Sequence, residues 1–448
     1  MLATLDIILV IAYFVAIVIV GYLSSRKESE EEFLIGNKKI GIWHNIATLT
    51  ATKITASLFI TYVALVYVFG IGALWIFIGA GFGYLLFLLF GIKLKKEGDK
   101  YNYYSIADYF YHHYGYFTGK LSSITIFLIT FLNFTIQIIG GAIILENLID
   151  LSFFYGVLIV SGVILFYLYI GGFKAVVKTD VVQFVSIVLL LVILGIFLFT
   201  NFSYEPSQWS LLSPGIGIII SFFIVGVLFP FSAPDLWQRV LAAKSVKALK
   251  KSFVLTTIFY VLFGALLSFI AIIIKLKLPG IDANAALVQG FIQLLPAGLL
   301  GLALIPLFAA IMSSADSFAF ICGGLLMHDI IFRNKEYDKV SLLKYGILVT
   351  IFSGTVLALS FQSILKASYL FAGIFMVFSI IIITTWIKPS VKPIIINSGI
   401  ILGIIITIIF ALFKGISTNL IVIGVIGGII GMIAGAIVSK SIKRKKLG

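Results

Sequence analysis

The sequence predicts an all-α integral membrane protein with about thirteen transmembrane helices. Hydrophobic residues make up 61% of the 448 residues and charged residues only 11%, whereas soluble domains carry about 25% charged residues. Many apolar stretches exceed the roughly 20 residues that cross a bilayer core as a helix. The basic residues gather in alternate loops between these stretches, which is typical of a multi-pass membrane protein.

The apolar segments that can span the bilayer follow one another along the whole chain, with short polar stretches between them. In chain order the predicted spans are 4–24, 42–68, 71–92, 118–145, 152–171, 180–200, 214–238, 252–274, 297–328, 343–361, 367–387, 393–413 and 418–438. Two of the intervals are more than simple loops. Tyr101–Tyr116 has the composition of an interfacial segment, and a short helix is expected at Ala283–Leu294 within the loop Leu278–Pro296. A turn is expected at Gly171-Gly172.

The distribution of Lys and Arg predicts the orientation in the cell membrane. With the N-terminus outside, 27 of the 32 basic residues, Arg239 among them, lie in cytoplasmic loops or in a cytoplasmic C-terminal tail. Four lie outside, and Lys53 lies within a span. The net charge of +14 is therefore a sign of topology and does not indicate a nucleic-acid partner. The one cysteine, Cys322, excludes a disulfide within the chain.

Two of the predicted spans carry features that interrupt helices. Polar residues crowd the second span between Thr48 and Ser57, and Pro230 and Pro234 lie four apart in the seventh. Taken as two halves, 42–200 and 214–388, the chain has five spans in each, so the halves have opposite orientation and each opens on a broken helix. Broken helices at matching positions of inverted halves indicate the central site of a secondary transporter. The helix 4–24 and the helices of 393–438 would flank this core within a single domain, 1–448.

Four stretches resemble the sodium:solute symporter family, which includes proline, pantothenate and sugar carriers. They begin with Tyr22–Gly36 after the first span and continue with Tyr169–Gln183, Gln238–Ser245 and Ala309–Ser317. The resemblance implies the five-plus-five inverted repeat of the amino-acid transporter LeuT. It also implies a cation-coupled carrier that imports a small polar organic solute, such as proline, another amino acid or an organic acid, by alternating access.

The resemblance also assigns ion-binding positions. A sodium site would use backbone oxygens of the first broken helix and groups of the ninth span, at Ala51, Ile54, Ala310, Ser313 and Ser314. A second ion or proton site would involve Lys53, Asp180, Asp316 and Ser317. The spacing of Ala310, Ser313, Ser314 and Ser317 places them in one stripe of a helix, and hydroxyl and carbonyl oxygens suit a hard cation.

Lys53 departs from the family pattern, because an ammonium close to a sodium site would repel the ion by about 4 kcal/mol at 4 Å. Charged residues at bilayer depth are usually paired and functional. We therefore expect Lys53 to pair with Asp316, with Asp180 nearby. Two interpretations stay open: the pair is structural beside a working sodium site, or Lys53 replaces the ion in a proton-coupled or cation-independent carrier.

The solute would lie between the broken helices and against the fourth and ninth spans. The candidate residues are Thr55, Ser57, Phe59, Asn133, Gln137, Phe229, Ser232 and Trp237. No nucleophile, metal-binding cluster or nucleotide motif stands out, so no cofactor beyond Na+ or H+ is expected, and the chain is not expected to be an enzyme. The expected partners are the solute and the lipid bilayer, with no obligatory protein partner evident. A channel and a polytopic membrane enzyme are the other function classes.

Overall fold

The computed structural model of the chain describes residues 3–24, 40–51, 53–149, 151–199, 206–283, 286–333, 339–361, 364–417 and 419–445. Within these ranges the secondary structure is helical, apart from an isolated bridge between Ile40 and Ala243. Nine helical stretches of the described residues are long and apolar enough to cross a membrane. The predicted all-α membrane class is therefore confirmed.

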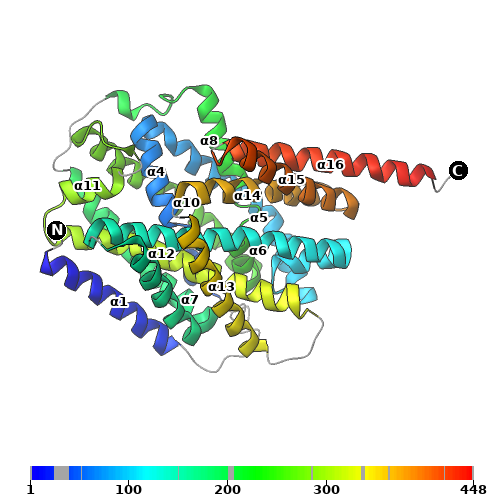
Figure 1. Ribbon diagram of the computed structural model, residues 1–448, viewed down its shortest axis with the longest axis horizontal. Helices are drawn as coiled ribbons and strands as arrows, with labels where there is room; N and C mark the ends of the chain where they lie inside the picture. The colour runs from blue at the N-terminus through cyan, green and yellow to red at the C-terminus, as the bar shows by residue number, and fades with distance from the viewer. Residues whose placement is uncertain are drawn as a thin grey trace.

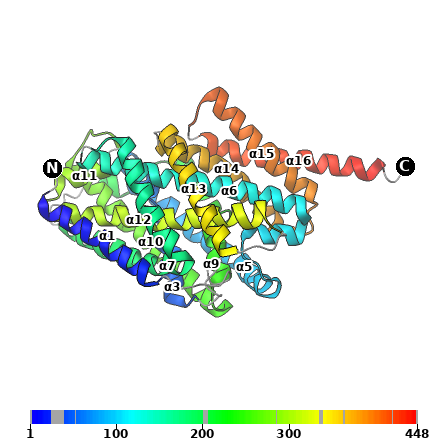
Figure 2. The same cartoon turned by 60° about the horizontal axis from the view of Figure 1, so that its bottom comes forward.

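Long helices pass through the middle of the molecule and others line its edges (Figures 1 and 2). In chain order they are α1 (Thr4–Ser24), α3 (Ile42–Ala51), α4 (Ala56–Phe69), η2 (Gly70–Leu74), α5 (Trp75–Tyr101), α6 (Ile106–Ile149), α7 (Phe153–Phe199), η3 (Pro206–Trp209), α8 (Ile216–Leu228), α9 (Pro234–Ala242), α10 (Val246–Lys277), α11 (Ala286–Leu294), α12 (Leu299–Gly324), η5 (Leu325–Ile331), α13 (Lys339–Phe361), α14 (Ile364–Ile387), α15 (Pro393–Lys414) and α16 (Asn419–Lys445). The short helix α11 confirms the one expected at Ala283–Leu294.

Both spans that the sequence predicts to be broken are interrupted in the structure. The first gives α3 and α4, which are separated by four residues that include Lys53. The Thr55 side chain accepts a hydrogen bond from the backbone N–H of Leu58 at 3.0 Å and so begins α4. The second span gives α8 and α9, and α9 begins at Pro234, which has no N–H to leave unsatisfied.

Other boundaries differ from the sequence-based expectation. The spans predicted at 152–171 and 180–200 fall within one element, α7, whose helical assignment runs through Gly171-Gly172. Its two apolar parts, Phe153–Phe166 and Lys178–Phe197, are separate stretches. Glycine lowers helix stability by only about 1 kcal/mol relative to alanine, so a glycine pair without a proline need not end a helix. In α6, by contrast, Gly115 has a φ of 82° and a ψ of 178°, and this break sets Ile106–Tyr114 apart as a short helix.

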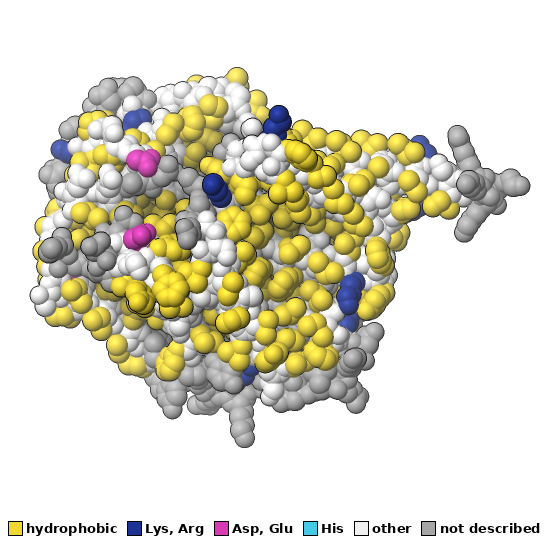
Figure 3. All heavy atoms as spheres, viewed as in Figure 1, with side chains coloured by type: hydrophobic (Ala, Val, Ile, Leu, Met, Phe, Trp, Pro, Cys, Tyr) yellow, Lys and Arg dark blue, Asp and Glu magenta, His cyan; other side chains and the backbone are white. Residues whose placement is uncertain are grey.

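Helix α12 and its continuation η5 form the centre of the bundle. In the most apolar window of Leu299–Ile331, 89% of the residues are buried, compared with 28% in Pro393–Lys414 and in Asn419–Ile442. Helix α12 packs against α1, α6, α7 and α13, whereas α15 and α16 pack together at the edge, where α16 carries the C-terminus away from the core (Figure 1). Hydrophobic side chains cover much of the face in Figure 3, as contact with lipid requires.

The N-terminal helix α1 is attached to the start of α12 through one buried carboxylate. Asp6 Oδ1 accepts hydrogen bonds from the backbone N–H groups of Gly298 and Gly301, both at 2.7 Å. Gly301 allows this approach, because a Cβ there would lie 2.5 Å from the Asp6 Cα. The carboxylate thus satisfies the free N–H groups at the N-terminus of α12.

We expect Asp6→Ala to lower the free energy of unfolding by about 1.5–3 kcal/mol, the usual net value of hydrogen bonds to a charged group. Thermal unfolding of the purified protein in detergent measures this loss. Glu146→Ala is the control, because Glu146 is an exposed carboxylate. Equal melting temperatures for the Asp6 and Glu146 variants would show that the cap does not contribute to stability.

Candidate functional site

An ion pair joins the two interrupted helices. The Lys53 Nζ lies 2.7 Å from Oδ1 and 2.7 Å from Oδ2 of Asp235. Lys53 follows the end of α3, and Asp235 lies in the first turn of α9. The two side chains are 4% and 2% exposed, so the pair lies inside the protein. We call these two residues the lysine pair.

The expected partner of Lys53 was wrong. The sequence favoured Asp316, but the carboxylate that Lys53 contacts belongs to Asp235. Asp316 is buried on α12, where its Oδ1 accepts a hydrogen bond from the backbone N–H of Ser317 at 2.6 Å. Which carboxylate faces the lysine depends on how α9 and α12 are rotated about their axes, and the local sequence does not fix that rotation. The expectation that Lys53 is buried and paired is confirmed.

Arg239 is the centre of a second polar cluster, which we call the arginine network. Its Nη2 donates to Ser317 Oγ at 2.8 Å and to Thr48 Oγ1 at 3.0 Å, and lies 3.4 Å from Asp180 Oδ2. Thr48 also donates to Asp180 Oδ2. The network therefore ties α9 to α3, α7 and α12 through one guanidinium that is 1% exposed.

The assignment of Arg239 to a cytoplasmic loop missed this role. All nine residues of α9 are buried, so its only basic side chain has no access to solvent. One signal was present in the sequence: Asp235 and Arg239 lie four apart after a proline, and this spacing places both on one face of a short helix. An acidic and a basic residue that lie one turn apart directly after a helix break indicate charged side chains inside the protein.

The ends of α3 and α9 that lie away from the breaks are also joined by hydrogen bonds. The backbone N–H of Ile40 donates to the Ala242 carbonyl at 3.2 Å, and Lys244 N–H donates to the Ile40 carbonyl at 3.0 Å. The residue before α3 is thereby joined to the residues after α9. Together with the arginine network, this bridge ties α3 to α9.

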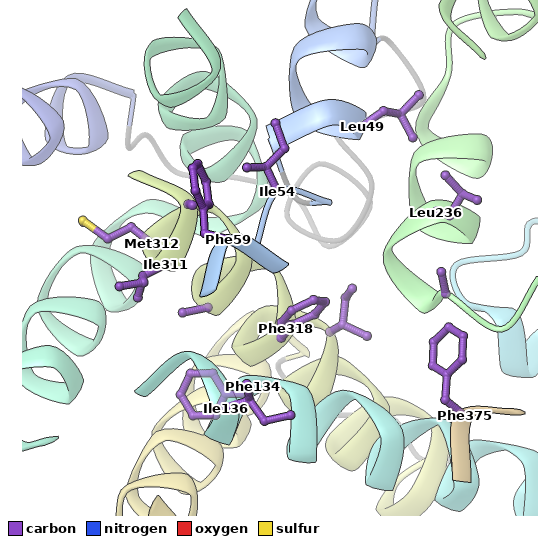
Figure 4. Packing of buried hydrophobic residues seen from close by; sticks show 14 of the residues in the cluster. Leu49, Ile54, Phe59, Phe134, Ile136, Leu236, Ile311, Met312, Phe318 and Phe375 are labelled. Carbon is purple, nitrogen blue, oxygen red and sulfur yellow. The ribbon is translucent and has the colours of Figure 1, made fainter. Parts of the chain in front are cut away.

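The positions assigned to sodium lie on elements that pack together. Ala51 ends α3 and Ile54 lies in the break, while Ala310, Ser313 and Ser314 are buried on α12. Helix α12 packs against both α3 and α4, and Figure 4 shows Ile54 in the same apolar region as Ile311 and Met312 of α12. The Ser313 hydroxyl lies 3.3 Å from the Ala310 carbonyl, to which it donates.

The second ion or proton site predicted at Lys53, Asp180, Asp316 and Ser317 is divided between two clusters. Asp180 and Ser317 both contact Arg239, whereas Lys53 contacts Asp235. A cation between Asp180 and Ser317 would lie beside the guanidinium, which repels it.

Two of the candidate solute residues lie at the break between α8 and α9. The Lys53 Nζ lies 5.3 Å from the centre of the Phe229 ring, and this ring stacks on Phe375 with a centroid distance of 5.0 Å. Ser232 Oγ donates to the Phe375 carbonyl at 3.0 Å and lies 2.7 Å from Ser379 Oγ. These contacts place α14 against the second break, beside the lysine pair.

The other candidate solute residues have contacts of several kinds. Gln137 Nε2 donates to the Asn133 side chain at 3.2 Å, which confirms that these two share a face of α6. The Phe59 ring packs edge-on against Phe263 at 5.6 Å, and the Trp237 indole donates to the Phe231 carbonyl at 2.8 Å. Thr55 caps α4, and the side chain of Ser57 lies outside the described residues, as does most of the motif Tyr22–Gly36.

Comparison with known proteins shows which family the chain is similar to. The model of the sodium:solute symporter family matches residues 33–210, a region that contains α3, α4 and the first break. Over this region the chain is similar to the sodium:solute symporter family. A sodium/pantothenate symporter of Haemophilus influenzae is 23% identical over 73% of this chain and 71% of its own length. Sodium/proline symporter 2 of Staphylococcus saprophyticus is 26% identical over 55% of this chain, and the chain spans about half of that relative, 51%.

Known structures of symporters show the same fold. A Na+-coupled sialic acid symporter in a substrate-bound, outward-open state superimposes with a TM-score of 0.79 and 19% identity over 97% of this chain and 98% of its own. At this level of identity the similarity shows a shared fold.

Proposed function

We propose that the chain is a secondary active transporter that imports a small polar organic solute by alternating access, coupled to sodium. The observation that carries this proposal is the meeting of the two interrupted helices at a buried ion pair. Unwound segments at bilayer depth are tolerated where they line a site or are buried in protein, and in secondary transporters they bind solute and ion.

The proposed architecture has two inverted halves, 42–200 and 214–388, with the helix 4–24 before them and the helices of 393–438 after them. Helix α7 then crosses the membrane twice, through its apolar parts Phe153–Phe166 and Lys178–Phe197, which makes thirteen crossings. The charge distribution supports an N-terminus outside and a C-terminus in the cytoplasm. The end of the core at the arginine network is then the cytoplasmic end.

Sodium is the coupling ion that the geometry favours. The alternative, in which Lys53 replaces the ion, places the ammonium at the α12 hydroxyls, but the ammonium contacts Asp235 of α9 and the Phe229 ring of α8. The proposed sodium ligands are the carbonyls of Ala51, Ile54 and Ala310 and the hydroxyls of Ser313 and Ser314. The pantothenate and proline symporters among the relatives are named for sodium, which supports the same choice.

The solute is proposed to bind beside Phe229 and Ser232, with Asn133 and Gln137 as further polar contacts. Phe59, Trp237 and Thr55 have packing or capping contacts that account for them, so their contribution to binding is indirect. Proline, other amino acids and organic acids such as pantothenate are the solutes to test first.

Uptake into proteoliposomes under separate sodium and proton gradients tests the function. We expect saturable accumulation of one solute that is driven by an inward sodium gradient and that a proton gradient alone does not support. Accumulation driven by protons without sodium would contradict sodium coupling and support the alternative in which Lys53 replaces the ion. Ohmic currents without saturation would identify a channel.

A further inference from the structure

The lysine pair differs from the other buried ionic contacts in how few hydrogen bonds it makes. Within the described part of the chain, the Lys53 ammonium donates to Asp235, and the Asp235 side chain accepts from Lys53. An ammonium has three donors and a carboxylate can accept about four hydrogen bonds. In the arginine network, by contrast, Arg239 donates to Thr48, Ser317 and Gln238 as well as to Asp180. The lysine pair therefore has unused capacity for further partners.

The pair lies between helix ends of both polarities. Lys53 follows the C-terminal end of α3, and Asp235 lies at the N-terminal end of α9. The C-terminus of a helix favours a cation and the N-terminus an anion. The ends of α8 and α4 add another C-terminus and another N-terminus at the same breaks. The breaks thus offer fixed positions for one positive and one negative group.

The surroundings of the pair are apolar on one side. The Phe229 ring lies against the ammonium, and Phe375 stacks on Phe229. Phe371 lies next to Phe375 with a centroid distance of 5.1 Å. This aromatic wall suits a hydrocarbon or a ring close to the charged groups.

We propose that the lysine pair is the recognition element for a zwitterionic solute, an amino acid, whose carboxylate binds Lys53 and whose ammonium binds Asp235. The solute inserts between the two side chains, so that one ion pair becomes two and no charge is left unpaired. This inference rests on the proposed transport function and narrows its solute class.

The charges that a solute carries distinguish amino acids from sugars and simple carboxylates as ligands of the lysine pair. A sugar cannot supply the charges that the two side chains need once they separate. A simple carboxylate would pair with Lys53 and leave Asp235 buried without a cation, which is costly. A solute with one positive and one negative group avoids both penalties.

Thermal-shift titration of the purified full chain tests the proposal. The probes are the twenty protein amino acids, together with analogues of each hit that lack either the amine or the carboxylate; for L-proline these are cyclopentanecarboxylate and pyrrolidine. We expect at least one amino acid to stabilise the protein and both of its analogues to bind at least about tenfold more weakly, because each loses contacts to a charged group. An analogue with a single charge that binds as tightly as its amino acid would overturn the proposal.

The double variant Lys53→Met/Asp235→Asn separates recognition from a structural role. Replacing both members of a buried ion pair is often tolerated, so we expect a folded protein whose amino-acid affinity falls at least about 100-fold. Lys95→Met/Asp99→Asn is the matched control, because Lys95 is buried and pairs with Asp99 at 2.8 Å away from the breaks. Unchanged affinity in the Lys53/Asp235 variant would show that the pair is structural.

The same preparation in proteoliposomes distinguishes failure of the inference from failure of the proposed function. One outcome is sodium-driven, saturable uptake of D-glucose or of a simple carboxylate, without uptake of any amino acid. It would support the proposed transport function and contradict the proposal that the lysine pair recognises an amino acid. Absence of sodium-driven uptake for all of these solutes would overturn both.

Discussion

Replacing Arg239 with glutamine is expected to abolish solute uptake and to lower the free energy of unfolding by about 3–5 kcal/mol. The substitution leaves Asp180 buried without its cation, and the loss of one member of a buried pair costs about this much. It also removes the donor that joins Thr48 and Ser317. Helices α3, α9 and α12 would then lose the group that joins them. Uptake assays and thermal unfolding in detergent measure the two effects.

Two companion variants make the Arg239 experiment specific. Arg239→Gln/Asp180→Asn removes both charges, so we expect part of the stability to return while uptake stays absent, because the tie between the helices is still missing. Lys247→Gln removes an exposed basic residue at the start of α10 and should have no effect on either measurement. Normal uptake by Arg239→Gln would show that the arginine network is not needed for transport.

Ser314→Ala and Ser313→Ala are expected to raise the sodium concentration needed for half-maximal uptake by about 10- to 100-fold. Each substitution removes one proposed oxygen ligand, and a polar contact to a charged group is worth about 1.5–3 kcal/mol. Saturating sodium should restore most of the maximal rate, because the solute contacts are unchanged. Sodium titrations of initial uptake rates in proteoliposomes provide the measurement.

Ser353→Ala is the control for the sodium experiment. Its hydroxyl donates to the Val349 carbonyl of its own helix, α13, at 2.7 Å, so it is a half-buried serine of ordinary structural type. Ser314→Thr keeps a hydroxyl and should retain more of the sodium affinity than Ser314→Ala. A sodium dependence that is the same in all of these variants would place the ion elsewhere.

Features that depend on residues close together in the chain could be predicted from the sequence. The length of each apolar segment sets the membrane class, because about 20 apolar residues are needed for a crossing. The break in the seventh span follows from Pro230 and Pro234, which remove backbone donors, and Pro234 does begin α9. The stripe Ala310, Ser313 and Ser314 follows from the helical repeat, and all three residues are buried on α12, whose other faces are buried as well.

The local sequence did not distinguish glycines that end a helix from glycines that lie within one. The helical assignment of α7 runs through Gly171-Gly172, where the sequence suggested a turn. Gly115 marked no expected break within the predicted segment Tyr101–Tyr116, yet its positive φ separates two helices. A glycine permits both conformations, and packing against other helices selects between them.

The sequence by itself determined that this chain spans a membrane, where two of its helices are interrupted, and that a lysine must be buried with a partner. The tertiary structure decided which groups meet: Asp235, and not Asp316, contacts Lys53, and Arg239 joins four helices. Lys53 and Asp235 are 182 residues apart in the chain. Contacts over such distances depend on the relative rotation and spacing of whole helices, which are set by the packing of many side chains at once. Local propensity, by contrast, acts over a few residues and cannot specify them.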